Sequence, residues 1–258
     1  MGDLLKDKVA IITGGGRGIG REYALGFVDQ GAKVVIPDTV LENAESVVKG
    51  IEAKGGEAIA LHADISDEDT TKMVADRTFE QFGKIDILVN NAAIYANIGF
   101  RPWDSLSAEE WDRIFAVNVK GTWLMCKAVV PFMMKEGKGK IINIGSNTSG
   151  APKGAEALFH YASTKGAIIV MTRLLARALG DSQINVNCIA PGFTLTEASL
   201  TQANQPPGGI APHVAMGQCF RRSEQPEDLV GTAIYLASHL SDFVTGQLIP
   251  VDGGSWLR

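Results

Sequence analysis

The stretch VAIITGGGRGIG (residues 9–20) joins a short apolar run to a turn rich in glycine. The run at 9–12 has the length and composition of a buried strand, and an amphipathic helical pattern follows the turn. Glycines at positions 14, 18 and 20 let the backbone turn tightly and approach a phosphate, and the start of a helix offers free N–H groups. The spacing matches neither the G-x-G-x-x-G fingerprint nor a P-loop. The stretch therefore predicts an α/β fold with a candidate phosphate-binding turn, and a plain strand-to-helix turn is the alternative.

Apolar runs alternate with helical patterns along the whole chain. The runs that we interpret as strands are VAII (9–12), VVI (34–36), AIAL (58–61), IDILV (85–89), KIINI (140–144), INVNCI (184–189) and LIPV (248–251). The helical patterns lie near 19–30, 40–54, 67–82, 107–135, 161–180 and 226–238. Unbroken apolar strands are typical of a parallel sheet that helices cover on both faces. The alternation predicts a doubly wound, seven-stranded parallel sheet of the Rossmann type, formed by residues 1–258 as a single domain.

Composition excludes several classes of function. The chain of 258 residues has a net charge of −5 and no visible basic patch, so we expect neither nucleic acid nor a membrane as partner. Its three cysteines are far apart and odd in number, which favours the reducing cytoplasm over a disulfide framework. The four histidines do not cluster with the cysteines, so no metal site is predicted. We also expect no secretory signal and no membrane-spanning segment.

Residues 159–166, FHYASTKG, place Tyr161 four positions before Lys165. Positions i and i+4 share one face of a helix, so the ammonium would lie beside the phenol. A nearby positive charge lowers the pKa of a phenol from its ordinary value of about 10. A phenol whose pKa is brought toward neutrality can give and take a proton. The alternative is an interfacial tyrosine that a lysine side chain passes on its way to solvent.

Three other polar residues are candidates for the site. Two of them end predicted strands, where open α/β sheets bind their ligands, and the third is expected to be buried and to need hydrogen-bond partners. Asp38 ends the second predicted strand, about 20 residues past the glycines, where a ribose-binding carboxylate is expected. Ser146 closes the KIINI strand. Asn118 falls on the apolar face of the 107–135 helix, where an amide without partners costs about 1–3 kcal/mol. Each also has a structural interpretation: a strand-end acid, a turn serine and an amide that caps neighbouring backbone.

In their order along the chain, these features resemble one family. TGGGRGIG (13–20), NNAA (90–93), Asn118, Ser146, YASTK (161–165), PG (191–192) and VDGG (251–254) are similar to the motifs of short-chain dehydrogenases/reductases, over essentially the whole chain. The resemblance implies a nicotinamide-dependent oxidoreductase with the catalytic residues Asn118, Ser146, Tyr161 and Lys165. It implies cofactor contacts from Gly14, Arg17, Gly18, Ile19, Asp38, Asp64, Ile65, Asn91, Tyr161, Lys165, Pro191, Gly192 and Thr194. It also implies a homo-oligomer, a tetramer.

The resemblance assigns a role to each catalytic side chain. Tyr161 would be the general acid in ketone reduction and the general base in alcohol oxidation. Lys165 would lower the pKa of Tyr161 and bind the nicotinamide ribose. Ser146 would hydrogen-bond the substrate oxygen, and Asn118 would hold a proton-relay water behind Lys165.

The chain departs from the family pattern in two places. Ser146 and Tyr161 are 15 positions apart, a couple more than the family usually shows. Either the loop at 151–159 carries an insertion beside the substrate, or Ser149 is the catalytic serine; we favour Ser146, because it directly ends the strand. NNAA replaces the usual NNAG, a change from which little consequence is expected.

The predicted cofactor is NAD. Asp38 would accept hydrogen bonds from the ribose hydroxyls and would repel the extra phosphate of NADP, for which a carboxylate has no donor. Thr39 follows, where the family's NADP users often carry an arginine. Arg17 is ambiguous, because its guanidinium could pair with that phosphate.

The predicted substrate is a small secondary alcohol or its ketone. A sugar or polyol dehydrogenase is one alternative, with hydroxyl contacts from Asn147, Lys153, Glu156 and His213. A 3-oxoacyl reductase is another, to which the acidic net charge gives little support. A non-enzymatic binding protein is a third, against which the complete catalytic set argues. Residues 194–222, an irregular stretch that contains QPPGG (205–209), are predicted to be a substrate lid.

Overall fold

The computed structural model describes residues 3–96, 98–152, 154–201, 209 and 211–257. The described strands are β1 (Val9–Ile12), β2 (Lys33–Asp38), β3 (Ala58–His62), β4 (Ile87–Asn90), β5 (Gly139–Ile144), β6 (Ile184–Pro191) and β7 (Leu248–Val251). The described α-helices are α1 (Gly18–Asp29), α2 (Leu41–Glu52), α3 (Glu68–Phe82), α4 (Ala108–Phe115), α5 (Thr122–Glu136), α6 (Phe159–Leu179), α7 (Glu197–Leu200), α8 (Ala211–Gly217) and α9 (Glu227–Ala237).

The strands form one parallel sheet in the order β3-β2-β1-β4-β5-β6-β7. In its register Ile11 of β1 lies opposite Val35 of β2 on one side and Leu88 of β4 on the other. The chain winds outward in both directions from β1, so the strand order reverses between β1 and β4. Loops on either side of such a reversal diverge and leave a crevice at the carboxyl ends of the strands, where ligands bind.

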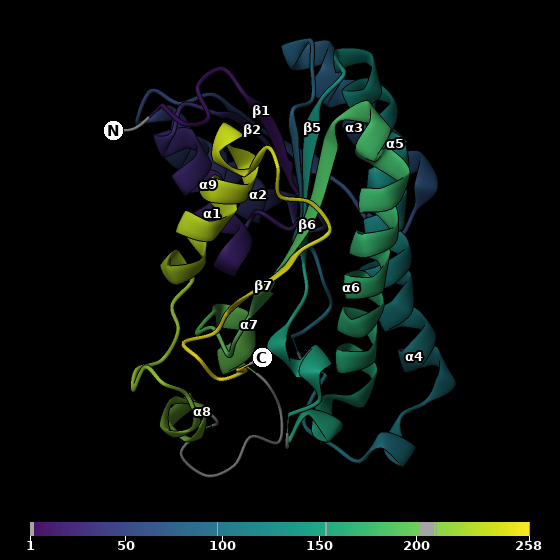
Figure 1. Cartoon of the computed structure of the whole chain (residues 1–258), viewed down its shortest axis with the longest axis vertical. Coiled ribbons are helices and arrows are strands. Elements are labelled where there is room, and N and C mark those ends of the chain that lie inside the picture. The colour runs from purple at the N-terminus through teal and green to yellow at the C-terminus, as the bar shows by residue number, and fades with distance from the viewer. Residues whose placement is uncertain (1–2, 97, 153, 202–208, 210, 258) are drawn as a thin grey trace.

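Helices cover both faces of the sheet (Figure 1). Helices α1, α2 and α9 lie on one face, and α3, α5 and α6 lie on the other. Alternate residues of each strand supply the two cores: Ala10 and Ile12 of β1 pack toward α1 and α9, and Ile11 packs toward α3 and α5. Because helices cover both faces of the sheet, most strand positions are apolar, which explains the apolar runs in the sequence.

The predicted architecture is confirmed: all seven predicted strands are present in one parallel sheet. The pattern at 107–135 is not one uniform helix, however. A π-helical turn (Ala116–Gly121) separates α4 from α5, and such turns concentrate at functional sites. Ser107 and Glu110 form a capping box at the start of α4.

The described parts of the stretch between β6 and α9 contain helical structure that the sequence pattern did not predict. Two short helices, α7 and α8, lie beyond the carboxyl end of the sheet (Figure 1). Of the QPPGG segment, positions 205–208 lie outside the described residues. No helix in the described part of the chain is long and apolar enough to cross a membrane.

Candidate active site

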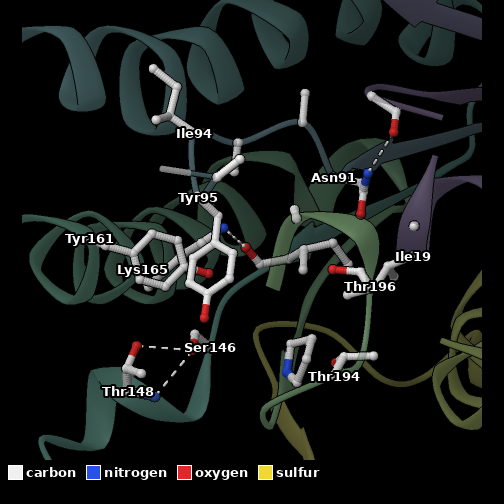
Figure 2. Close-up of a pocket in the computed structure, with 18 of the residues that line it drawn as sticks. Ile19, Asn91, Ile94, Tyr95, Ser146, Thr148, Tyr161, Lys165, Thr194 and Thr196 are labelled. Carbon is white, nitrogen blue, oxygen red and sulfur yellow. Dashed lines mark hydrogen bonds between the residues drawn. The ribbon is translucent and has the colours of Figure 1, made fainter. Parts of the chain in front are cut away.

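A cavity of about 1080 Å³ opens at the carboxyl ends of the central strands. Residues that end or follow β1, β2, β4, β5 and β6 all line it, as the strand-order reversal requires. The predicted site residues that line the cavity are Gly14, Arg17, Gly18, Ile19, Asp38, Asp64, Ile65, Asn91, Ser146, Tyr161, Lys165, Pro191, Gly192 and Thr194. Figure 2 shows the part of this cavity around Tyr161 and Lys165. The structure thus brings together every predicted site residue except Asn118.

The glycine-rich turn forms one end of the cavity. Gly14 and Gly18 have φ angles of 64° and 53°, in the left-handed region that favours glycine. A Cβ atom at Gly14 would stand 2.9 Å from the Cα atom of Ala92 in the loop after β4. Arg17 precedes α1 in an extended conformation, and its side chain does not cap the helix. The N-terminus of α1 is therefore left open to an anion, as the phosphate-binding interpretation requires.

Backbone donors hold the carboxylate of Asp38 beside this turn. Its Oδ2 atom accepts a hydrogen bond from the N–H of Gly16 at 3.1 Å, and its Oδ1 atom accepts one from the N–H of Val40 at 3.0 Å. A Cβ atom at Gly16 would lie 2.8 Å from Oδ2, so only glycine admits this contact. Asp38 therefore has a fixed orientation, in which it ties the end of β2 to the turn that follows β1.

Asn91 ties the two strands on either side of the reversal together. Its Nδ2 atom donates to the carbonyl oxygens of Thr13 at 3.0 Å and Gly14 at 3.2 Å. Its backbone N–H donates to Oγ1 of Thr13 at 3.0 Å. The amide thus fixes the width of the crevice between β1 and β4, in addition to lining it.

Helix α6 places Tyr161 and Lys165 on the cavity wall next to the end of β5 (Figure 2). The Nζ atom of Lys165 lies 5.5 Å from the centroid of the Tyr161 ring. The same atom donates to the carbonyl oxygen of Ile144 at 2.8 Å. Lys165 is only 4% exposed, so its ammonium does not extend into solvent, and the alternative of a solvated lysine is excluded.

The two side chains have shifted pKa values, and the shift of Tyr161 differs from the one predicted. Burial raises the pKa of the Tyr161 phenol and the neighbouring Tyr95 adds to this, whereas a hydrogen bond with Ser146 lowers it. Burial lowers the pKa of Lys165 to about 8. The predicted net lowering of the Tyr161 pKa toward neutrality is therefore not found for the groups of this chain alone, because desolvation of the phenolate is the largest effect.

Ser146 has the position expected of the catalytic serine. It lines the cavity, and its Oγ atom accepts hydrogen bonds from the N–H of Thr148 at 3.2 Å and from its hydroxyl at 2.9 Å. Ser149 is not among the described residues that line the cavity, and its hydroxyl donates to the carbonyl oxygen of Ser146. The geometry therefore favours Ser146 over Ser149.

Asn118 lies behind the wall of the cavity, in the π-helical turn. Its Oδ1 atom accepts from the N–H of Ile94 at 2.7 Å, and its Nδ2 atom donates to the carbonyl oxygen of Ile94 at 3.3 Å and to Oγ1 of Thr164 at 3.2 Å. The buried amide thus caps the backbone at Ile94, which lines the cavity, and it connects this loop to α6. A role in holding a relay water stays a prediction.

The wall near Tyr161 is apolar. Ile94, Tyr95, Phe100 and Leu158 line the cavity there, and they belong to one apolar cluster with Tyr161. The rings of Tyr95 and Tyr161 are 4.9 Å apart between centroids. These residues belong to no motif, so sequence reasoning missed them; their only signal is that two of them directly follow NNAA.

Of the side chains that would contact the hydroxyls of a polyol, only some line the cavity. Asn147 and His213 line the cavity. Glu156 is exposed and accepts a hydrogen bond from the N–H of Gly154 at 2.7 Å. Lys153 lies outside the described residues. The loop at 151–159 does adjoin the cavity, because Pro152 and Leu158 line it, as expected of an insertion beside the substrate.

The chain is similar to known proteins over nearly its whole length. A family model described as enoyl-(acyl carrier protein) reductase matches residues 14–255. The sorbitol dehydrogenase of Cereibacter sphaeroides and the galactitol 2-dehydrogenase of Agrobacterium fabrum are each 38% identical over 262 residues, covering 98% of this chain and 99% of each relative. The solved structure of 3-ketoacyl-(acyl-carrier-protein) reductase from Brucella melitensis complexed with NADH matches with a TM-score of 0.88 at 33% identity. The match covers 98% of this chain and 100% of the chain of the Brucella reductase.

Replacing Lys165 by methionine is expected to stabilise the fold at neutral pH. Because the pKa of Lys165 in the folded protein is about 8, below its ordinary value of 10.5, the unfolded chain binds more protons between these values. Deprotonation of Lys165 in the folded protein therefore increases the free energy of unfolding of the wild type as pH rises from about 8 to 10.5. Lys165→Met should be more stable by about 1–3 kcal/mol at pH 7, and the difference should vanish near pH 10.5. Urea unfolding at both pH values measures it; a destabilised variant at pH 7 would contradict this view of the buried ammonium.

Proposed function

Because this chain belongs to the short-chain dehydrogenase/reductase family, we propose that it uses NAD to interconvert a small apolar secondary alcohol and its ketone. The resemblance seen in the sequence is confirmed at the level of the family, and the chain is an oxidoreductase that acts on CH–OH groups. One observation carries the finer proposal. Tyr161, Lys165 and Ser146 line the same cavity as the glycine-rich turn and Asp38.

The residues that line the cavity fit a dinucleotide. Gly14 and Gly18 adopt backbone conformations open to few other residues, and the N-terminus of α1 has no side-chain cap, so this end suits a pyrophosphate. Asp38 presents a fixed carboxylate for ribose hydroxyls. The NADH complex of the Brucella reductase is a further reason to expect a nicotinamide cofactor here. When bound, the nicotinamide supplies the acceptor or donor of the hydride.

We propose that the chain's own groups orient the substrate and move the proton. Ser146 donates a hydrogen bond to the substrate oxygen. Tyr161 gives its phenolic proton to that oxygen in reduction and accepts it in oxidation. Because burial raises the pKa of Tyr161, the neutral phenol is its resting form, which suits reduction directly. In oxidation the positively charged Lys165 over the ring favours the phenolate.

The apolar wall favours a substrate with little polar surface beside the reacting carbon. Tyr95, Phe100 and Leu158 can exclude water from a cyclic or aromatic group, and each buried CH₂ contributes about 0.8 kcal/mol. Sorbitol and galactitol carry hydroxyls along the whole chain and would lose hydrogen bonds against this wall. A polyol substrate remains the alternative, because Asn147 and His213 also line the cavity and two relatives are polyol dehydrogenases.

We propose that the segment at 194–222 is the substrate lid. Helices α7 and α8 lie below the sheet in Figure 1, and His213, Val214 and Gly217 of α8 line the cavity. A segment at this position can close over substrate and keep water away from the proton and hydride transfers.

We further propose a cytoplasmic homotetramer. Large apolar side chains on the outer faces of α5 and α6, including Trp123, Val170 and Leu174, are 46%, 54% and 63% exposed. A second copy of the chain would bury this apolar surface. A monomeric sedimentation coefficient at micromolar concentration would contradict the proposal.

The activity test is NAD reduction over a panel of cyclic, aromatic and polyol secondary alcohols. We expect apolar alcohols to exceed sorbitol and galactitol in kcat/KM by about tenfold or more, given the apolar wall. On the best substrate, Tyr161→Phe should lose about 10²–10⁴-fold in kcat while it still binds NADH, because only the phenolic hydroxyl is removed. Tyr235→Phe on α9, 36% exposed and remote from the cavity lining, is the matched control. A Tyr161→Phe enzyme within tenfold of wild type would refute the assignment.

Cofactor choice should depend on the charge of Asp38. The phosphate of NADP would lie against a carboxylate that backbone donors hold in place, so we expect NAD to be preferred by about 10²-fold or more. Asp38→Ala and the closer mimic Asp38→Asn should each raise NADP use relative to NAD, measured as the ratio of kcat/KM values. Equal efficiency of the wild type with both cofactors, which Arg17 could bring about, would show that Asp38 does not decide the choice.

Lid closure should appear in amide hydrogen exchange. We expect slower exchange in peptides that cover α7 and α8 when NADH and a substrate analogue are added together, because closure buries backbone now exposed. Peptides from α2, which the cavity does not include, serve as the internal reference. Unchanged exchange in both lid helices would count against a lid.

A further inference from the structure

The two ends of the proposed lid meet at Thr194 and Glu224. These residues form an isolated parallel bridge, and the N–H of Leu195 donates to the carbonyl oxygen of Glu224 at 2.9 Å. The chain therefore leaves β6, passes through α7 and α8, and returns to the same point before α9 begins. Whatever holds this point also holds the base of the lid and the loop that follows β6.

The carboxylate of Glu224 makes the closest contacts at this point. Its Oε1 atom accepts a hydrogen bond from the hydroxyl of Thr194 at 2.6 Å, and its Oε2 atom accepts one from the N–H of Gly192 at 3.1 Å. A Cβ atom at Gly192 would stand 2.7 Å from Oε2, so the loop approaches the carboxylate as closely as glycine permits. Gly192 and Thr194 both line the cavity, whereas Glu224 lies behind them and is 6% exposed.

Charged and titratable groups surround Glu224 from several elements. Burial, with smaller effects from the charges of Asp252 after β7 and Asp228 of α9, raises the pKa of Glu224 to about 7. Arg222 forms an ion pair with Asp228 rather than with Glu224. Tyr23 of α1 is fully buried, and its own pKa is raised by burial and by the charge of Glu224. No cation among the described side chains hydrogen-bonds to Glu224, so its bonds to the loop are what satisfy it.

We propose that Glu224 is a positioning residue, whose ionised carboxylate holds the Gly192–Thr194 wall of the cofactor site and the base of the lid in the binding geometry. The proposal rests on the proposed function for its cofactor, and on the hydrogen bonds of Glu224 for its geometry. Both oxygens of the ionised form accept, and these hydrogen bonds are charge-assisted. In a protonated acid or a glutamine one of the two positions becomes a donor, so either the bond from Gly192 is lost or the hydroxyl of Thr194 must accept instead, and the remaining bonds are neutral.

The sign of the pH dependence follows from these bonds. Hydrogen bonds to an ionised acceptor are about twice as strong as neutral ones, so the loop is held more firmly above pH 7 than below it. Because the folded pKa of Glu224 is raised, its own contribution to stability is present at low pH and is lost as pH rises from 4.5 to about 7. The hydrogen bonds from the loop to Glu224 therefore strengthen over the same pH range in which Glu224 contributes less to the stability of the fold.

The test compares NADH affinity of the wild type and Glu224→Gln at pH 6 and pH 8, by fluorescence titration or calorimetry. We expect the variant to bind about fivefold more weakly at pH 8 and to match the wild type at pH 6, where Glu224 is mostly protonated. Lys165 also titrates near this range, but it is common to both proteins and cancels in the comparison. Glu227→Gln, the same change on an exposed acid three positions along, should bind like wild type at both pH values.

Hydrogen exchange provides a second readout that needs no cofactor. Peptides that cover residues 190–196 should exchange faster in Glu224→Gln than in wild type at pH 8. If the glutamine variant fails to fold, Thr194→Val leaves the carboxylate in place and removes one of its donors, and the same loss of NADH affinity is expected. Equal affinity and equal exchange at pH 8 in whichever variant folds would overturn the proposal. Failure of the wild type to bind NADH would instead refute the proposed function. The exchange comparison would still test whether Glu224 holds the loop at 192–194.

Discussion

The position of Tyr161 depends on one buried contact, in which the ammonium of Lys165 donates to the carbonyl oxygen of Ile144 at 2.8 Å. This bond joins α6 to the last residue of β5, and Ser146 follows only two positions later. Burial of an ammonium is costly, and the lowered pKa of Lys165 reflects that cost. The chain thus accepts a loss of stability in order to fix the tyrosine, the lysine and the serine relative to one another.

The remainder of the site depends on the reversal of strand order between β1 and β4. β1 and β4 form a parallel ladder up to Ile12 and Val89, and beyond the strand ends side chains make the connections. Asn91 bridges the two strands, and Asp38 binds the turn after β1 from the end of β2. Both residues therefore serve the shape of the cavity as well as its lining. Their substitution would disturb the turn in addition to any ligand contact.

Three carboxylates in and behind the cavity wall, those of Asp38, Glu224 and Asp252, accept hydrogen bonds from the loops that follow the strands. Asp38 accepts from two backbone N–H groups, Glu224 accepts from Gly192 and Thr194, and Asp252 accepts from the N–H groups of Gly254 and Trp256. A protein of net charge −5 can still offer a place for an anionic dinucleotide, because N–H groups and a helix N-terminus provide the positive potential. In the function proposed here, the acids orient the loops and the backbone faces the cofactor.

The sequence by itself determined the parallel sheet, the positions of its strands and most of the motif residues that line the cavity. Local features carry this information: strands that are apolar on both faces, a glycine-rich turn, and a tyrosine and a lysine one helical turn apart. Only the tertiary structure decided which residues form the apolar wall around Tyr95, where Asn118 directs its amide, and that Glu224 reaches Gly192 across 32 positions. It also decided that the pKa of Tyr161 is raised, because burial and the neighbouring Tyr95 come from segments distant in sequence. Spacing along a helix specifies which neighbours share a face, but the dielectric environment of a side chain depends on everything that packs around it.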